Sequence, residues 1–151
     1  MPDVVITLPI EADLEGISRL AWPDPELAHR KRIRLRNWYD AGCIVVAKKA
    51  DEVIAFAIFD RSFFDNTFIR WIVVHEEHRR RGIARGMVRA LTERSSTVKV
   101  FTSTTESNYP MRLLLDSLGW ENVGTVRGLD DGDPEMFYRA PGEGARAKRI
   151  A

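Results

Sequence analysis

The sequence predicts a mixed α/β fold with about seven strands in one sheet and four helices, and three observations lead to this prediction. Short β-branched and apolar runs recur along the chain, which is typical of strands. Between them lie segments whose apolar residues repeat at helical spacing. A central strand–helix–strand unit, residues 67–76, 82–94 and 98–104, has the form of a crossover between parallel strands.

The first half of the chain is expected to form a strand, two helices and three strands. These elements are strand 4–8, helices 13–21 and 25–40, and strands 43–49, 53–64 and 67–76. Pro25 suits the first turn of a helix, which needs no N–H there, and the dipeptide at 41–42 ends in the glycine that often closes a helix. The run 67–76 is almost continuously apolar, as expected of a strand covered on both faces.

The second half is expected to form a helix, a strand, a second helix and a hairpin. These elements are helix 82–94, strand 98–104, a helix between Asn108 and Gly119, and strands 122–129 and 135–140. Leucines and methionines at helical spacing define the helices, and the acidic loop 130–134 joins the hairpin strands. We expect one domain over residues 1–140 and a flexible tail over 141–151.

Composition excludes several classes of protein. The 151 residues include 23 basic and 22 acidic side chains, for a formal charge of +1, so a surface that binds polyanions everywhere is excluded. Cys43 is the only cysteine, so no intramolecular disulfide is possible. No apolar run reaches the length of a membrane span, and the first residues lack the pattern of a signal peptide. We therefore expect a cytoplasmic protein with no membrane partner.

A basic turn between strand 67–76 and helix 82–94 is the strongest functional signal. The stretch "HEEHRRRGIARG" places Gly82 and Ala84 at the start of the helix. The exposed N–H groups and positive dipole of a helix N-terminus attract anions, and a residue without a side chain lets a ligand approach the backbone. The arginines around this turn favour a compact diphosphate over an extended nucleic acid. Without that placement, a basic triplet would indicate only a solvated surface.

Two motifs resemble the GCN5-related N-acetyltransferase (GNAT) family. The stretch "VHEEHRRRGIA" is similar to its acetyl-CoA signature, R/Q-x-x-G-x-G/A, with Arg79, Gly82 and Ala84 at the fixed positions. The stretch "NYPMRLLLDSLGW" is similar to the second motif, an asparagine followed by a helix that ends in glycine and an aromatic residue. Both motifs occur in the family's order, and the resemblance covers roughly residues 4 to 140.

The resemblance implies a binding site for acetyl-CoA as acyl donor, with no metal. Amides of the loop from Arg80 to Arg85 would bind the diphosphate, the strand holding Ile72 and Val74 would pair with the pantetheine amides, and Asn108 would brace the pantetheine arm. Asn108 is also placed to cap its helix. The expected cofactor-binding residues are Ile72, Val73, Val74, Arg79, Arg80, Arg81, Gly82, Ile83, Ala84, Arg85 and Asn108.

The catalytic residues are less well indicated. Many family members carry a tyrosine acid on the last helix, and the corresponding residue here is Leu115. Tyr109, Ser103 and Glu76 are the candidates for proton transfer, each with the alternative of a packing or solvated role. Ser103 stands where some relatives carry a carboxylate, and it can orient a water but is no strong base.

The acceptor is expected to be a primary amine of a small molecule or peptide. Trp22, Asp24, Trp38 and Asp131 are the candidate substrate-binding residues, because acidic groups would attract a cationic amine. The alternative for the acidic loop is a polar turn. Two other functions stay open: a non-catalytic acyl-CoA sensor, which the missing tyrosine favours, and a nucleic-acid module built on the arginines of helix 25–40. The spread of those arginines around the helix disfavours the module, and a homodimer remains open.

Overall fold

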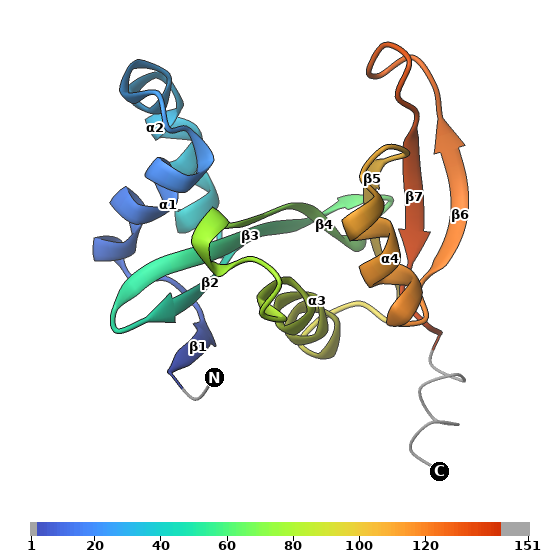
Figure 1. Cartoon of the computed structure of the whole chain (residues 1–151), viewed down its shortest axis with the longest axis horizontal. Helices are drawn as coiled ribbons and strands as arrows, with labels where there is room; N and C mark the ends of the chain where they lie inside the picture. The colour runs from blue at the N-terminus through green and yellow to red at the C-terminus, as the bar shows by residue number, and fades with distance from the viewer. Residues whose placement is uncertain (1–2, 143–151) are drawn as a thin grey trace. The chain divides into compact units, whose positions relative to one another are not determined.

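The computed structural model describes residues 3–142 and has seven strands and four α-helices (Figure 1). The strands are β1 (Val4–Thr7), β2 (Ile44–Lys49), β3 (Glu52–Phe63), β4 (Asn66–Val74), β5 (Val100–Thr105), β6 (Glu121–Val126) and β7 (Glu135–Arg139). The helices are α1 (Leu14–Ala21), α2 (Pro25–Asp40), α3 (Ile83–Glu93) and α4 (Tyr109–Ser117), with 3₁₀ turns η1 (Glu11–Asp13) and η2 (Glu76–His78). The strand order is β1-β2-β3-β4-β5-β7-β6. This confirms the predicted mixed sheet.

The chain folds as two compact units. One contains Met1–Phe59 with Trp71–Glu93, and the other contains Asp60–Arg70 with Arg94–Ala151. Strand β4 contributes its first residues to the second unit and Trp71–Val74 to the first. The prediction of a single domain over residues 1–140 stays a prediction.

The first unit is built around apolar side chains of β2 and β3 that pack beneath α1 and α2. Ile17 of α1 and Phe56 of β3 are fully buried in this core, and the Trp71 ring meets the Phe56 ring edge-on at 5.2 Å. On α3, a Cβ atom added to Gly86 would lie 3.0 Å from Ile6 Cδ1, so the missing side chain permits close packing between α3 and β1.

A buried ion pair joins η1 to β2 in the same unit. Asp13 is only 4 % exposed, and its carboxylate accepts from the N–H of Ile10 at 2.8 Å. Lys48 Nζ lies 3.0 Å from the other carboxylate oxygen. The burial of a charge is tolerated here because the carboxylate has both a cation and a backbone donor.

The second unit shows the two-residue alternation of a sheet covered on one face. Thr102 and Thr104 of β5 and Met136 and Tyr138 of β7 are buried, while the residues between them are half-buried. Helix α4 covers the buried face (Figure 1). From this helix, Arg112 Nε donates to Tyr138 Oη at 3.3 Å. The opposite face of these strands carries phenylalanine rings.

Most predicted boundaries agree with the structure to within two residues, but the strand predicted over 122–129 ends at Val126. The end of β4 also differs from the prediction. The predicted strand 67–76 stops at Val74, and η2 follows. The N–H of His75 still donates to Ile54 O at 2.8 Å, but His75 Nδ1 accepts from the N–H of Glu77 at 3.1 Å and so caps the 3₁₀ turn. The predicted tail 141–151 lies, apart from its first two residues, outside the described residues.

Candidate functional site

The turn between η2 and α3 has the backbone shape of an anion cradle. Arg80 and Gly82 both adopt left-handed conformations, with φ of 63° and 78°. Alternation of left- and right-handed residues turns successive N–H groups toward one point. The N–H of Gly86 donates to Gly82 O at 3.0 Å, which is the first bond of α3. The amides of Ile83 and Ala84 therefore stand in the first turn, where an α-helix offers its N–H groups no partner.

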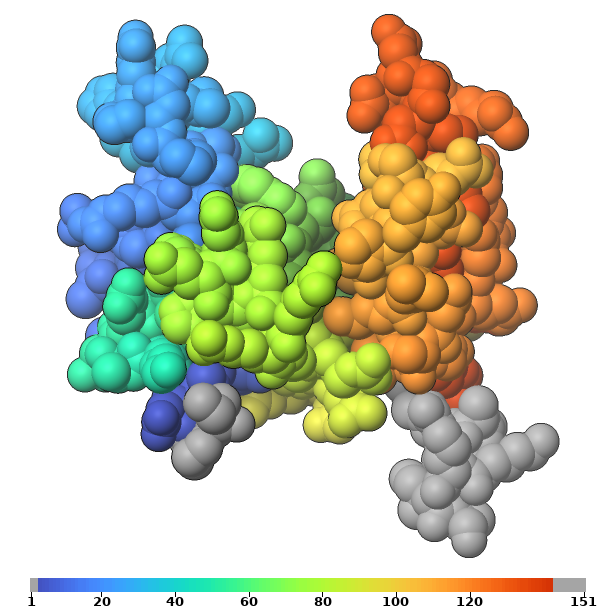
Figure 2. Space-filling view, viewed as in Figure 1, coloured from blue at the N-terminus to red at the C-terminus, as the bar shows by residue number. Residues whose placement is uncertain are grey.

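The side chain of Arg79 holds this turn in place. Its Nε donates to the carbonyl of Val74 at 3.1 Å, so the guanidinium bridges the end of β4 and the start of the turn. Arg79, Arg80 and Arg81 are exposed, and none of them has an ion pair within residues 3–142. Figure 2 shows this segment at the surface in yellow-green. The turn is thus basic and open to solvent.

A small cavity of about 180 Å³ adjoins the turn. Its walls combine the basic side chains of Lys49, His78 and Arg81 with apolar side chains of β1 and Ile83. The rings of His75 and His78 meet edge to face at 5.6 Å. Glu76, a candidate for proton transfer, lies exposed in η2.

The remaining proton-transfer candidates lie in the second unit. Tyr109 is 65 % exposed, and the Arg112 guanidinium stands 5.6 Å from the centre of its ring. Ser103 Oγ donates to Glu135 Oε2 at 2.7 Å. Leu115, at the position of the family's tyrosine, is fully buried. Of these residues, only Ser103 contacts a carboxylate.

Asn108 caps α4, as its place in the sequence predicted. Its Oδ1 accepts from the N–H of Met111 at 3.3 Å. Just before it, Ser107 donates to Asp133 through its Oγ at 2.6 Å and its N–H at 3.1 Å. These two bonds, the hydroxyl first, hold the pKa of the Asp133 carboxyl below its ordinary value. They also fasten the loop between β6 and β7 to the start of α4.

The four candidate acceptor residues have different environments. Trp22 is 9 % exposed, and its ring packs at 5.9 Å from that of Trp71, so it belongs to the core of the first unit. Asp24 caps α2 by accepting from the N–H of Glu26 at 3.1 Å. Trp38 is half-buried with the Arg34 guanidinium 5.3 Å from its ring centre.

The fourth, Asp131, is exposed on the loop that Asp133 fastens. The first unit contains Trp22, Asp24, Trp38, Glu76 and the turn 79–85, and the second unit contains Ser103, Asn108, Tyr109 and Asp131. Sequence reasoning did not find the roles of Asp133 and Glu135, since their partners depend on strand register.

Three of the four arginines of α2 have partners within the protein, which weakens the case for a nucleic-acid module. Arg36 pairs with Glu11, and Arg32 Nη1 donates to the carbonyl of His29 at 2.6 Å. Arg34 stacks over Trp38. Within residues 3–142, no helix is long and apolar enough to cross a membrane.

Comparisons with known proteins give the family and the fold of this chain. A family model described as acetyltransferase (GNAT) family matches residues 12–120. A GNAT-family acetyltransferase structure from Bacillus cereus ATCC 10987 is 30 % identical, with a TM-score of 0.83 over 92 % of this chain and 97 % of that chain.

Two further solved structures share the fold at lower identity. One is yncA, a putative acetyltransferase from Salmonella typhimurium with its cofactor acetyl-CoA, at 19 % identity and TM-score 0.73 over 91 % of this chain and 92 % of that chain. The other is a ribosomal-protein-alanine N-acetyltransferase from Brucella melitensis, at 20 % identity and TM-score 0.74 over 89 % of this chain and 98 % of that chain. No curated protein matched the sequence significantly.

Proposed function

The chain belongs to the GNAT acetyltransferase family, and on that premise we propose that it transfers the acetyl group of acetyl-CoA directly to a primary amine of a small molecule or peptide. The observation that carries the proposal is the left-handed turn at the N-terminus of α3. The related fold from Salmonella typhimurium, whose structure contains acetyl-CoA, supports the choice of donor.

The shape of the turn fits a diphosphate. A Cβ atom added to Gly82 would meet no other atom within 4 Å, so the backbone there faces open space. Arg80 holds a φ of 63°, a conformation that costs a residue with a side chain on the order of 1 kcal/mol. Arg79 fixes this conformation through Val74 O. A turn that is strained, braced and open has the features of a preorganised anion site.

The residues that would hold acetyl-CoA follow from this shape. The amides of Ile83 and Ala84 and the side chains of Arg80 and Arg81 would bind the diphosphate oxygens. Backbone groups of Ile72 to Val74 would pair with the pantetheine amides, as an added strand pairs with a sheet edge. Asn108 uses Oδ1 for its helix, which leaves its amide nitrogen to donate.

Acetyl-CoA would supply an acetyl group on a thiol, which is a tolerable leaving group at neutral pH because thiols have a pKa near ~8.5. In the transfer, the free amine nitrogen forms a bond to the acetyl carbon, and the carbon–sulfur bond breaks with its electron pair on sulfur. One amine proton leaves to solvent or sulfur. Leu115 cannot donate a proton to the departing sulfur, so the reaction would lack the factor of about 10²–10⁴ that a positioned acid provides.

Calorimetry with acetyl-CoA tests the turn. Gly82→Leu should abolish binding, because the new side chain would extend into the space in front of the helix. Gly42→Leu is the matched control: Gly42 also has a positive φ, 72°, and no atom within 4 Å of an added Cβ. Both variants suffer similar backbone strain, so only the loss at Gly82 reports on the ligand. Equal affinity in the two variants would refute the assignment of the turn.

Release of free thiol across a panel of amines tests the reaction. The apolar Leu115 at the position of the family's tyrosine is the observation behind a second candidate function, a non-catalytic acyl-CoA sensor. The enzyme requires steady release of thiol that depends on the amine. Tight binding of acetyl-CoA with no release from any amine would support the sensor.

A further inference from the structure

The face of the second unit opposite α4 carries a cluster of phenylalanine rings. Phe63 lies at its centre: its ring centroid is 5.2 Å from that of Phe68, 5.0 Å from that of Phe101 and 5.6 Å from that of Phe137. These four side chains come from β3, β4, β5 and β7, and each is half-buried. Phe64 extends the cluster with a ring that is 84 % exposed. A contiguous apolar patch of this kind on a soluble protein indicates a binding surface.

Glu135 stands on the same face, next to these rings. It lies two residues before Phe137 on β7, so both side chains point to one side of the strand. Phe137 is the register partner of Ser103, whose Oγ donates to Glu135. Phe101 lies two residues before Ser103 on β5. A carboxylate therefore borders the phenylalanine rings, with a neutral hydroxyl as its hydrogen-bond donor.

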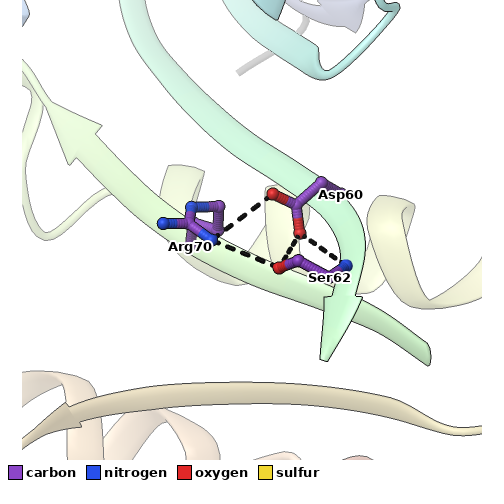
Figure 3. Close-up of polar contacts among 3 residues, drawn as sticks. All are labelled: Asp60, Ser62 and Arg70. Atoms are coloured by element: carbon purple, nitrogen blue, oxygen red, sulfur yellow. Dashed lines mark hydrogen bonds and ion pairs between the residues drawn. The ribbon is translucent and has the colours of Figure 1, made fainter. Parts of the chain in front are cut away.

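The cations on this face are already neutralised by other carboxylates. Arg70 Nη1 lies 3.4 Å from Asp60 Oδ2 and donates to Ser62 Oγ at 3.2 Å (Figure 3). Arg139, two residues beyond Phe137, pairs with Glu121 at 2.7 Å. Glu135 has no ion pair within residues 3–142. One half-buried negative charge beside aromatic rings is thus left without a counter-charge.

We propose that this face, formed by Phe63, Phe68, Phe101, Phe137 and Glu135, binds the acceptor, and that the acceptor is a primary amine on an aromatic or aliphatic body. The ammonium would pair with the Glu135 carboxylate and lie near ring faces, whose negative electrostatic potential attracts cations. The apolar body would cover the phenylalanine rings. The inference rests on the proposed acetyl transfer, and it narrows the acceptor from any primary amine to an apolar one.

Three small probes separate the charge from the body. 2-Phenylethylamine carries both, 2-phenylethanol carries only the body and ethylamine carries only the charge. Titration followed by protein NMR reports binding without any turnover. We expect 2-phenylethylamine to bind at least tenfold more tightly than either of the others and to shift the resonances of the named phenylalanines. Equal affinity for 2-phenylethylamine and 2-phenylethanol would show that the ammonium charge does not contribute to binding and would overturn the role of the Glu135 carboxylate.

Glu135→Gln keeps a group that can accept from Ser103 and removes only the charge. This variant should weaken the binding of 2-phenylethylamine at least tenfold and raise the KM for that amine by a similar factor. It should leave the affinity for acetyl-CoA unchanged. Glu106→Gln makes the same change at an exposed carboxylate without an ion pair in the described part of the chain, and should alter none of these values. Phe137→Leu tests the apolar contact and should weaken 2-phenylethylamine severalfold, but not ethylamine.

The results also separate this inference from the proposed function. Acetylation of polar amines, with no binding of 2-phenylethylamine to this face, would overturn the inference and leave the acetyl transfer standing. Binding of 2-phenylethylamine together with acetyl-CoA, without release of thiol, would overturn its role as acceptor. A Glu135→Gln protein with wild-type affinity and wild-type KM for this amine would also overturn the inference.

Discussion

Replacing Leu115 by tyrosine restores the family's usual residue, and the structure predicts that this change damages the protein without supplying an acid. Leu115 is a residue of α4, and its side chain is fully buried. A larger side chain in a packed core costs about 1–3 kcal/mol, and a buried hydroxyl without a partner costs about 1–3 kcal/mol more. We therefore expect Leu115→Tyr to lower the free energy of unfolding by about 2–6 kcal/mol.

Thermal unfolding measures this loss directly. In a chain of this size, 1 kcal/mol corresponds to about 2–4 °C in Tm, so Leu115→Tyr should lower Tm by roughly 4–24 °C. Leu113→Tyr is the matched control, since Leu113 lies on the same helix and is 67 % exposed. It should shift Tm by less than about 2 °C. The rate of thiol release should not rise in either variant.

One result would refute this reasoning. If Leu115→Tyr unfolds at the same temperature as Leu113→Tyr and accelerates thiol release by about 10² or more, the new hydroxyl reaches the reacting sulfur. Position 115 would then open into a ligand slot, and the burial of Leu115 would not hold in the complex with acetyl-CoA.

Three other predictions follow from the contacts described above. Lys48→Met leaves the buried Asp13 carboxylate without its cation and should destabilise the protein by about 2–3 kcal/mol in urea unfolding, somewhat less than for a fully buried pair because Lys48 is 16 % exposed. The control Lys49→Met breaks no ion pair within residues 3–142 and should cost less than about 0.5 kcal/mol, so equal losses in the two variants would contradict the role of the pair. Ser107 lowers the pKa of Asp133, so the contribution of the Asp133 carboxylate to stability is complete above its ordinary pKa and is lost as pH falls through the lower folded value. Ser107→Ala should raise the Asp133 pKa in carbon-detected NMR, and an unchanged pKa would contradict the assigned cause. Raising salt from 50 to 500 mM should weaken acetyl-CoA binding in calorimetry, because the turn attracts the diphosphate through exposed charges, and an affinity independent of salt would contradict this.

The parts of the fold that local chemistry determines were predictable from the sequence. The bounds predicted for α2, residues 25 to 40, agree with the structure, because Pro25 suits the first turn and Gly42, at a φ of 72°, follows the last. The basic turn was predictable for the same reason, since a glycine and three arginines at a strand-to-helix junction require no distant partner. The left-handed conformation of Arg80 was not predictable, because it depends on the hydrogen bond from Arg79 Nε to the carbonyl of Val74.

Features that depend on register could not be read from the sequence. Strand β5 begins at Val100 and not at residue 98, because Ser95, Thr97 and Thr67 form a hydroxyl network that occupies the preceding residues. Glu135 was overlooked for a related reason. Its bond to Ser103 joins residues 32 positions apart and requires the antiparallel register of β5 and β7.

The formal charge of +1 does not reveal two local charges of opposite sign, one in each unit, which match the charges of the two proposed ligands. At the turn before α3, Arg80 and Arg81 have no acidic partner within the described residues, which favours an anionic donor. Beside the phenylalanine rings, Glu135 has no cationic partner among residues 3–142, which favours a cationic acceptor. In the first unit the unpaired charge is positive and the proposed ligand is anionic; in the second unit the unpaired charge is negative and the proposed ligand is cationic. Because net charge sums over every charged side chain, it could not indicate either ligand, whereas the pairing of individual side chains does.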